Sequence, residues 1–214
     1  MKRAVGGRRR PGRPTGSTGD QTRARVLAAA VETFAQQGLA GTSMRDVSRR
    51  ARIRVSSLYH YFPSKEALFE AVQERAQTEI RDLMLTVVGQ GSDMREMARE
   101  AIGRLFDFFL KNRAYAQLSY RACLEGSGLG TDQHVLERWL GFLEGTLQPA
   151  EKRGEVKDVD PALFMATVDA LVHWHVVNDA FYRRLLGKGL DDPDTARRAR
   201  DHVITVALRT LGLE

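Results

Sequence analysis

The sequence predicts an all-α protein with about nine helices, arranged as a small N-terminal helical unit and a larger C-terminal bundle. Apolar residues recur at spacings of three and four over most of the chain, which is typical of amphipathic helices. No stretch shows the strict alternation of a half-buried strand. Helix starts are marked as well, because Asp160–Pro161 and Asp192–Pro193 each place an N-cap before proline at the first helical position.

The charges divide the chain into three expected segments: an arm at 1–19, a small helical unit at 20–66 and a helical bundle at 67–214. The arm holds six basic residues and no acidic ones, and the small unit holds eight basic and four acidic residues. The bundle is mildly acidic, with 19 basic and 23 acidic residues. A basic front predicts contact with a polyanion, while a merely solvated tail is the open alternative.

Composition excludes several classes of protein. A single cysteine, Cys123, excludes a disulfide framework and a cysteine zinc cluster. No apolar run reaches the ~18 residues of a membrane span, and the N-terminus lacks the apolar core of a secretory signal. We therefore expect a cytoplasmic protein with no membrane association, no cofactor and no metal.

The first helix is predicted over 21–37, ended by Gly38 in the left-handed conformation that suits glycine. Ser43 and Asp46 have capping-box spacing and start a short second helix. A turn at 52–54 precedes a short third helix at 55–61. The apolar residues expected to face inward are Leu27, Ala30, Val31, Phe34, Met44, Val47, Ala51, Val55, Leu58 and Phe62.

Pro63 ends the third helix and Ser64 caps the fourth. From there the apolar spacing and the breaks at glycine, serine and Asp-Pro predict helices over 65–88, 94–110, 113–125, 132–152, 161–186 and 193–211.

The second and third helices form a predicted helix-turn-helix, in which the later helix fits the major groove of DNA. Its exposed face offers hydroxyl groups and an imidazole that can bond phosphates or bases: Ser56, Ser57, Tyr59, His60 and Tyr61. Flanking cations supply phosphate contacts: Arg45, Arg49, Arg50, Arg52, Arg54 and Lys65. A small bundle whose tyrosines merely pack is the alternative.

Residues 26–68 resemble the DNA-binding domain of the tetracycline-repressor-like (TetR/AcrR) family. The matching segments are Phe34-Ala35-Gln36-Gln37-Gly38, Thr42-Ser43-Met44-Arg45-Asp46-Val47 and Leu58-Tyr59-His60-Tyr61-Phe62-Pro63-Ser64-Lys65-Glu66-Ala67-Leu68. The resemblance implies a homodimeric transcriptional regulator, usually a repressor, on a palindromic double-stranded operator. It also implies that a small molecule binds the C-terminal domain and releases the DNA.

The resemblance assigns roles to single residues. Tyr59 and Tyr61 would contact phosphates or thymine methyl groups, and His60 would lie at the floor or edge of the groove. Lys65 would hold a phosphate at the start of the fourth helix, and Thr42 or Ser43 would do so at the start of the second.

The sequence departs from the family in the turn, where Arg52 replaces the usual glycine and Arg54 the usual capping serine. A non-glycine residue at the first position predicts strain, and Arg54 is a candidate for a phosphate or guanine contact instead of a cap.

In the arm, Arg9-Arg10-Pro11-Gly12-Arg13-Pro14 resembles the core of an AT-hook, whose arginines lie in a narrow minor groove. Pro11 departs from that pattern, which has an arginine beside the glycine. Minor-groove docking, loose attraction to phosphates and an arm without a role in binding are the three alternatives.

The last two helices are apolar on more than one face, and the resemblance implies that they form a dimer interface; ordinary core packing is the alternative. The resemblance also places a ligand pocket among the central helices, whose aromatic content suggests an apolar or aromatic effector. Candidate lining residues, each equally readable as core, are Phe106, Phe109, Leu110, Tyr120, Cys123, Trp139, Phe142, Leu143, His173 and Trp174.

The function predicted from these patterns is a ligand-responsive repressor. An enzyme is disfavoured because no nucleophile elbow, phosphate loop or histidine–carboxylate motif is present. A non-specific architectural DNA-binding protein is the alternative: the basic arm fits it and the large acidic bundle does not.

Overall fold

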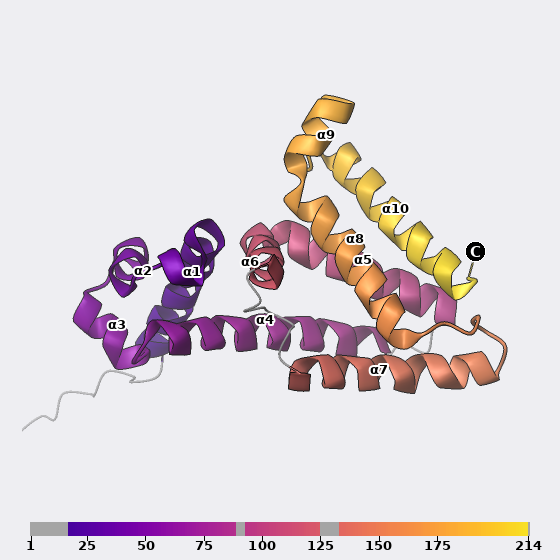
Figure 1. The fold of residues 1–214 in the computed structure, drawn as a ribbon, viewed down its shortest axis with the longest axis horizontal. Coiled ribbons are helices and arrows are strands. Elements are labelled where there is room, and N and C mark those ends of the chain that lie inside the picture. The colour runs from indigo at the N-terminus through magenta and orange to yellow at the C-terminus, as the bar shows by residue number, and fades with distance from the viewer. Residues whose placement is uncertain (1–16, 89–92, 125–132, 214) are drawn as a thin grey trace, which may run out of the picture.

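A computed structural model describes residues 17–88, 93–124 and 133–213, and within these ranges the chain forms ten helices and no strand (Figure 1). The first four are α1 (Ser17–Gly41), α2 (Met44–Ala51), α3 (Val55–Tyr61) and α4 (Lys65–Val88). The remaining six are α5 (Met94–Lys111), α6 (Arg113–Leu124), α7 (Gln133–Lys152), α8 (Pro161–Val177), α9 (Asp179–Leu186) and α10 (Pro193–Leu211). The all-α prediction is confirmed.

The α1–α3 unit follows the local signals of its sequence. Gly38 interrupts α1 with φ 71°, as expected at a helix end, although α1 begins at Ser17, four residues before the predicted start. The capping box of α2 is complete: the Asp46 amide donates to Ser43 Oγ at 3.2 Å, and the Ser43 amide donates to Asp46 Oδ2 at 3.3 Å. The division into segments at 1–19, 20–66 and 67–214 stays a prediction.

Helix α4 joins the two parts of the molecule (Figure 1). Its first turns pack against α1, where Phe69 meets Phe34 edge to face with ring centroids 5.2 Å apart. Its later turns pack against α5. Phe34, Leu68 and Val72 are fully buried, so the start of α4 belongs to the core of the α1–α3 unit.

The predicted helix over 161–186 is wrong, because α8 ends at Val177 and α9 begins at Asp179, which gives ten helices instead of nine. Asn178 has non-helical φ and ψ of −97° and 43°, and its side-chain amide donates to the Trp174 carbonyl at 2.8 Å. Asp179 Oδ1 then accepts from the Leu190 amide at 2.6 Å and thereby ties α9 to the segment before α10. These bonds redirect the chain between the two helices.

Helices α5, α8 and α10 pack together, with α6 and α7 against α8. Arg200 of α10 donates to Asp107 of α5 at 3.1 Å across this contact. In the described ranges, none of the helices combines the length and the apolar character that crossing a membrane requires.

Candidate functional site

The exposed face of α3 carries the residues expected to read DNA. Leu58 is fully buried and fixes the helix on the unit, while Ser56, Ser57 and His60 are exposed on its outer side. The Tyr59 side chain is 50% exposed. Tyr61 is half-buried, with its ring 5.7 Å from that of His60. The helix thus presents a polar and aromatic face.

The turn before α3 has the geometry that its two arginines predict. Arg52 adopts φ 55° and ψ 46°, and it is the only non-glycine residue with positive φ in the described ranges. Arg54 is the N-cap of α3, and its side chain makes no capping hydrogen bond. Both side chains are exposed and form no ion pair with another described residue. Their charges are therefore available to a ligand outside the protein.

The two hydroxyl groups before α2 have different surroundings. Thr42 is buried, and its Oγ1 donates to the Gly38 carbonyl at 2.7 Å. Ser43 is exposed and caps α2, so it is the residue of the pair that can meet a phosphate. Lys65 is half-buried at the start of α4, with Nζ 3.5 Å from the Ala40 carbonyl oxygen.

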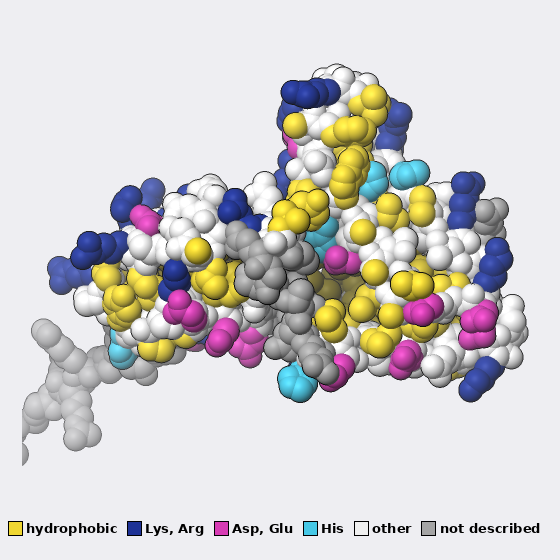
Figure 2. All heavy atoms as spheres, in the orientation of Figure 1, with side chains coloured by type: hydrophobic (Ala, Val, Ile, Leu, Met, Phe, Trp, Pro, Cys, Tyr) yellow, Lys and Arg dark blue, Asp and Glu magenta, His cyan; other side chains and the backbone are white. Residues whose placement is uncertain are grey.

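Other cations of the unit are held by neighbours. Arg49 pairs with Asp46 at 3.1 Å, and Arg50 donates to Gln36 at 2.7 Å. The guanidinium of Arg23 lies over the Phe62 ring at 5.4 Å, a contact that sequence reasoning missed. Figure 2 shows Lys and Arg side chains over the α1–α3 unit. Arg9, Arg10 and Arg13 lie outside the described residues.

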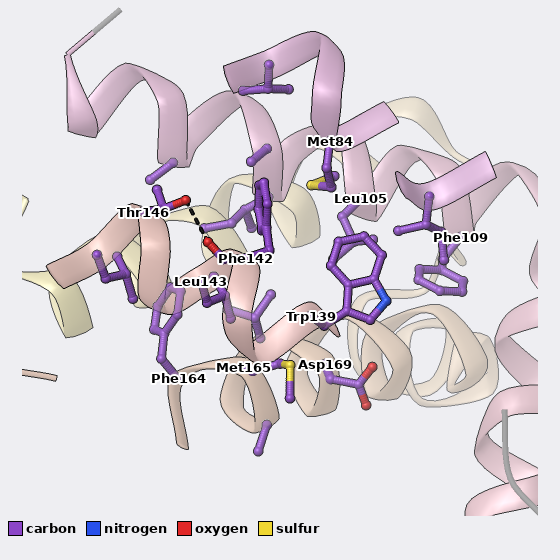
Figure 3. A pocket seen from close by; sticks show the side chains of 18 of the residues that line it. Met84, Leu105, Phe109, Trp139, Phe142, Leu143, Thr146, Phe164, Met165 and Asp169 are labelled. Atoms are coloured by element: carbon purple, nitrogen blue, oxygen red, sulfur yellow. Dashed lines mark hydrogen bonds between the residues drawn. The ribbon is translucent and has the colours of Figure 1, made fainter. Parts of the chain in front are cut away.

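The C-terminal helices enclose a cavity of about 480 Å³, which lies within the usual size range of small-molecule sites (Figure 3). Residues of α4, α5, α6, α7 and α8 line it, with Leu211 of α10. Figure 3 shows Phe109, Trp139 and Asp169 on one side of the view and Phe142 and Phe164 on the other. Most of the wall is apolar, and four methionines add soft, adaptable surface: Met84, Met94, Met97 and Met165.

Five of the ten predicted pocket residues line this cavity: Phe109, Trp139, Phe142, Leu143 and His173. The wall does not include four others, namely Phe106, Leu110, Tyr120 and Trp174. Phe106 is fully buried in the core, whereas Tyr120 and Trp174 are partly exposed on the surface. The side chain of Cys123 lies outside the described residues. Sequence reasoning missed most of the wall, because apolar residues of a core and of a cavity have the same spacing.

His173 and Asp169 form the one ionisable pair of the cavity wall. His173 Nδ1 lies 2.9 Å from the Asp169 carbonyl oxygen and 3.1 Å from Asp169 Oδ1. Burial opposes the charged imidazole, but the hydrogen bonds to Asp169 outweigh it and raise the pKa of His173 above its ordinary value. Among the described residues, no group of three His, Cys, Asp or Glu side chains is placed to hold a metal ion.

Helices α8 and α9 share an exposed apolar surface, the α8–α9 stripe, which consists of Leu163, Trp174, Phe181, Leu185 and Leu186. The Trp174 and Phe181 rings meet edge to face at 5.1 Å. Figure 2 shows hydrophobic side chains running over this region. The last two helices were predicted to form the dimer interface, but many of their apolar residues are buried within the chain's own core: Phe164, Val168, Val172, Val176, Val203, Ile204, Ala207, Leu208 and Leu211.

Comparison with known proteins gives these surfaces a context. Residues 26–72 match the sequence model of the bacterial regulatory proteins of the tetR family. The chain is 29% identical to the HTH-type transcriptional repressor SCO4008 of Streptomyces coelicolor, over 79% of this chain and 86% of that protein. Two further curated relatives match over 65% and 49% of their own length.

Solved structures share the fold. A TetR-like transcriptional regulator from Rhodococcus sp. RHA1 superimposes with a TM-score of 0.66 at 24% identity, over 90% of this chain and 97% of that one. The regulator FadR of Bacillus subtilis, in complex with stearoyl-CoA, has a TM-score of 0.66 at 19% identity, over 86% of this chain and 96% of that one.

The helix-turn-helix geometry, the match over residues 26–72 and the relatives with the same architecture lead to one conclusion. The chain carries the DNA-binding domain of the tetR family of bacterial regulatory proteins at residues 26–72 and is a sequence-specific DNA-binding transcriptional regulator.

Proposed function

We propose that the protein is a homodimeric repressor that leaves a palindromic operator when a small apolar or aromatic molecule enters the cavity. The observation that carries this proposal is that α4 extends from the DNA-binding unit to the cavity wall. Its first residue, Lys65, stands next to the α3 face, and its later turns supply Ala76, Gln77 and Ile80 to the cavity wall. A ligand that moves this wall therefore moves the base of the DNA-binding unit.

A second contact supports the same coupling. Helix α1 packs against α6, and α6 supplies Tyr115 and Ser119 to the cavity. Beside this contact, Arg75 of α4 donates to Glu79 at 2.7 Å in a half-buried site. A ligand would favour the arrangement of α4 and α6 that fits it best, and the operator would favour another.

On the DNA side, we propose that the α3 face enters the major groove and that basic groups around it hold phosphates. The proposed base-reading and groove-lining residues are Ser56, Ser57, Tyr59, His60 and Tyr61. The proposed phosphate contacts are Ser43, Arg52, Arg54 and Lys65, with Arg9, Arg10 and Arg13 of the arm. Thr42 would act indirectly, by fixing the segment that carries Ser43.

The α8–α9 stripe supports a homodimer. Leu163 is 68% exposed and Trp174 39% exposed, on one face of α8. A second copy that covers the stripe would bury these groups and set two α3 faces at a fixed separation, as a palindromic operator requires.

The names of the relatives agree with this proposal. The Streptomyces coelicolor relative is a transcriptional repressor, and the Bacillus subtilis regulator binds stearoyl-CoA, a molecule with a long apolar chain. We infer a regulatory and not a catalytic role, exercised on DNA in the cytoplasm.

Arg52→Gly should stabilise the protein by about 0.5–1 kcal/mol. The left-handed conformation costs a non-glycine residue about 1–2 kcal/mol, and the added freedom of an unfolded glycine offsets about half of that. Arg52→Ala is the matched control, since it removes the charge and keeps the strained conformation. Urea unfolding measures the gain. An Arg52→Gly midpoint no higher than that of Arg52→Ala would show that the turn stores no strain.

Arg54→Ser should give α3 the N-cap it lacks and add about 1 kcal/mol of stability. Both Arg54→Ser and Arg54→Ala should weaken DNA binding, because each removes a cation beside α3. Only Arg54→Ser adds a cap, so its unfolding midpoint should be higher than that of Arg54→Ala. Both variants lose the charge, so the two should bind one operator fragment equally weakly. Equal midpoints for the two would contradict the capping argument.

The test of the proposed function is selection of genomic fragments by the purified protein, followed by sequencing. A small set of fragments that share a short palindrome is the expected result. Recovery of A·T-rich DNA without a shared palindrome would instead support an architectural protein that binds mainly through its arm. The selected palindrome then serves in release assays with candidate effectors, and an effector that fills the cavity without weakening DNA binding would contradict the release mechanism.

A further inference from the structure

One polar atom of a cavity-lining residue has no hydrogen-bond partner among the described residues. His173 is 5% exposed, and its Nε2 is the one buried side-chain nitrogen or oxygen there without a hydrogen-bond partner. A buried polar atom without a partner destabilises a protein, so native structures rarely retain one. His173 lines the cavity, so an occupant that draws its ring inward can supply the partner that Nε2 lacks.

The other nitrogen of the ring determines what that partner must be. Nδ1 lies within hydrogen-bonding distance of two oxygens of Asp169, its carbonyl and its carboxylate. Both oxygens only accept, so Nδ1 carries a proton and donates. The carboxylate beside Nδ1 also stabilises a second proton on the ring, at Nε2. The group that faces Nε2 is therefore an oxygen that shares a proton with it.

The remaining polar groups of the wall restrict the ligand further. The Trp139 indole N–H donates to Gln77 Oε1 at 2.9 Å, and the Thr146 hydroxyl donates to the Phe142 carbonyl at 2.8 Å. These groups already have partners. The described lining residues include no lysine or arginine, so a phosphate or a second carboxylate would find no cation in the wall. Apart from the hydroxyl groups of Tyr115 and Ser119, the wall is mainly apolar, so most of the ligand must be apolar.

We infer that the effector is an apolar weak acid, with a ring body in the cavity and a single phenolic or carboxylic oxygen hydrogen-bonded to His173 Nε2. The inference rests on the proposed function, since it assumes that the cavity is the sensor site. The acid's proton either stays on the oxygen, which then donates to Nε2, or moves to Nε2, which then donates to the oxygen. In either case the oxygen of the acid is hydrogen-bonded to His173 Nε2.

The Phe109 ring packs against the imidazole of His173. Its centroid is 4.4 Å from that of the imidazole, at an angle of 54°. Phe109 and Trp139 are both in the wall, so a flat aromatic body beside His173 would meet aromatic faces and edges. A two-ring molecule is well within the capacity of a cavity of about 480 Å³.

The test uses four probes with one ring system: 2-naphthoic acid, 2-naphthol, naphthalene and 2-naphthylmethylamine. Binding to the full chain is measured by calorimetry and by the rise in melting temperature. Protein labelled with ¹⁵N-histidine reports the chemical shift of Nε2 directly. We expect the two oxygen probes to bind about tenfold or more tightly than naphthalene, because only they supply the missing partner. They should also shift the His173 Nε2 signal.

His173→Phe keeps an aromatic ring against Phe109 and removes both nitrogens. It should reduce the affinity for the oxygen probes to that for naphthalene and leave naphthalene binding in place. The matched control is His202→Phe, which changes an exposed histidine of α10 outside the cavity wall and should leave all four affinities unchanged. If His173→Phe does not fold, the comparison of the four probes on the unchanged chain still tests whether an oxygen group strengthens binding.

Each of the other outcomes would contradict a specific part of the proposal: the weak-acid assignment, the role of the cavity or the release mechanism. Equal affinity for naphthalene and the oxygen probes, or tightest binding of the amine, would overturn the weak-acid assignment and leave the sensor site intact. Failure of all four probes to bind would overturn both the assignment and the cavity's role as a small-molecule site. If the oxygen probes bind as expected but a selected operator fragment stays bound at saturation, the release mechanism fails and the assignment stands.

Discussion

The double variant Leu163→Glu, Trp174→Glu should be a monomer that binds an operator fragment at least about 100-fold more weakly than the unchanged chain. Both side chains belong to the α8–α9 stripe and are exposed in the single chain. Glutamates there stay in water in the isolated chain, where the main loss is the contact between the Trp174 and Phe181 rings. In a dimer, four uncompensated carboxylates would be buried, and each would cost several kcal/mol. Loss of the dimer then removes the joint binding of two half-sites.

The matched control is Leu85→Glu on α4, where the leucine is 58% exposed and lies outside the stripe. It should remain dimeric and bind the fragment as before. Light scattering measures the mass of each variant, and circular dichroism checks that the helices are kept. A double variant that stays dimeric would place the subunit interface on another surface.

The local signals of the α1–α3 unit allowed its structure to be predicted closely. Gly38 ends the regular part of α1, and Ser43 with Asp46 makes the capping box of α2. Each of these features involves residues within a few positions of each other, so the sequence alone carries the information. The strained turn at Arg52 was predicted for the same reason: only glycine adopts its backbone conformation without cost.

The break at Asn178 could not be predicted in this way. The segment 161–186 keeps apolar residues at helical spacing on both sides of the break, and Asn178 is compatible with a helix interior. The hydrogen bond from the Leu190 amide to Asp179 joins residues 11 positions apart. Such contacts depend on how the chain returns on itself, and apolar periodicity does not report them.

The cavity shows a second limit of periodicity. Phe106 and Phe109 lie one turn apart on the same side of α5, yet Phe106 is in the core and Phe109 lines the cavity. Whether an inward-facing ring meets a neighbour or an empty space depends on the side chains of other helices. His173 lines the cavity, but only the structure shows that its Nε2 lacks a partner among the described residues.

Deletion of residues 1–14 should weaken operator binding by about tenfold or more at 0.1 M salt and flatten its dependence on salt concentration. The deleted segment contains all six basic residues of the arm and no acidic residue. Each phosphate that loses its cation lowers the magnitude of the slope of log K against log salt by about 0.9. Loss of three phosphate contacts would therefore reduce the slope by about 3. Fluorescence anisotropy on one fragment, titrated at four salt concentrations, measures both effects.

A full-length variant with the order of residues 8–14 scrambled decides how the arm binds, because it keeps the charge and breaks the pattern around Gly12. If Arg10 and Arg13 lie in a narrow minor groove, scrambling should remove any preference for A·T-rich flanks and reduce affinity nearly as much as deletion does. If the arm only attracts phosphates, the scrambled chain should keep both the affinity and the salt slope of the unchanged chain. An unchanged slope after deletion would exclude both modes, because neither leaves the number of neutralised phosphates the same.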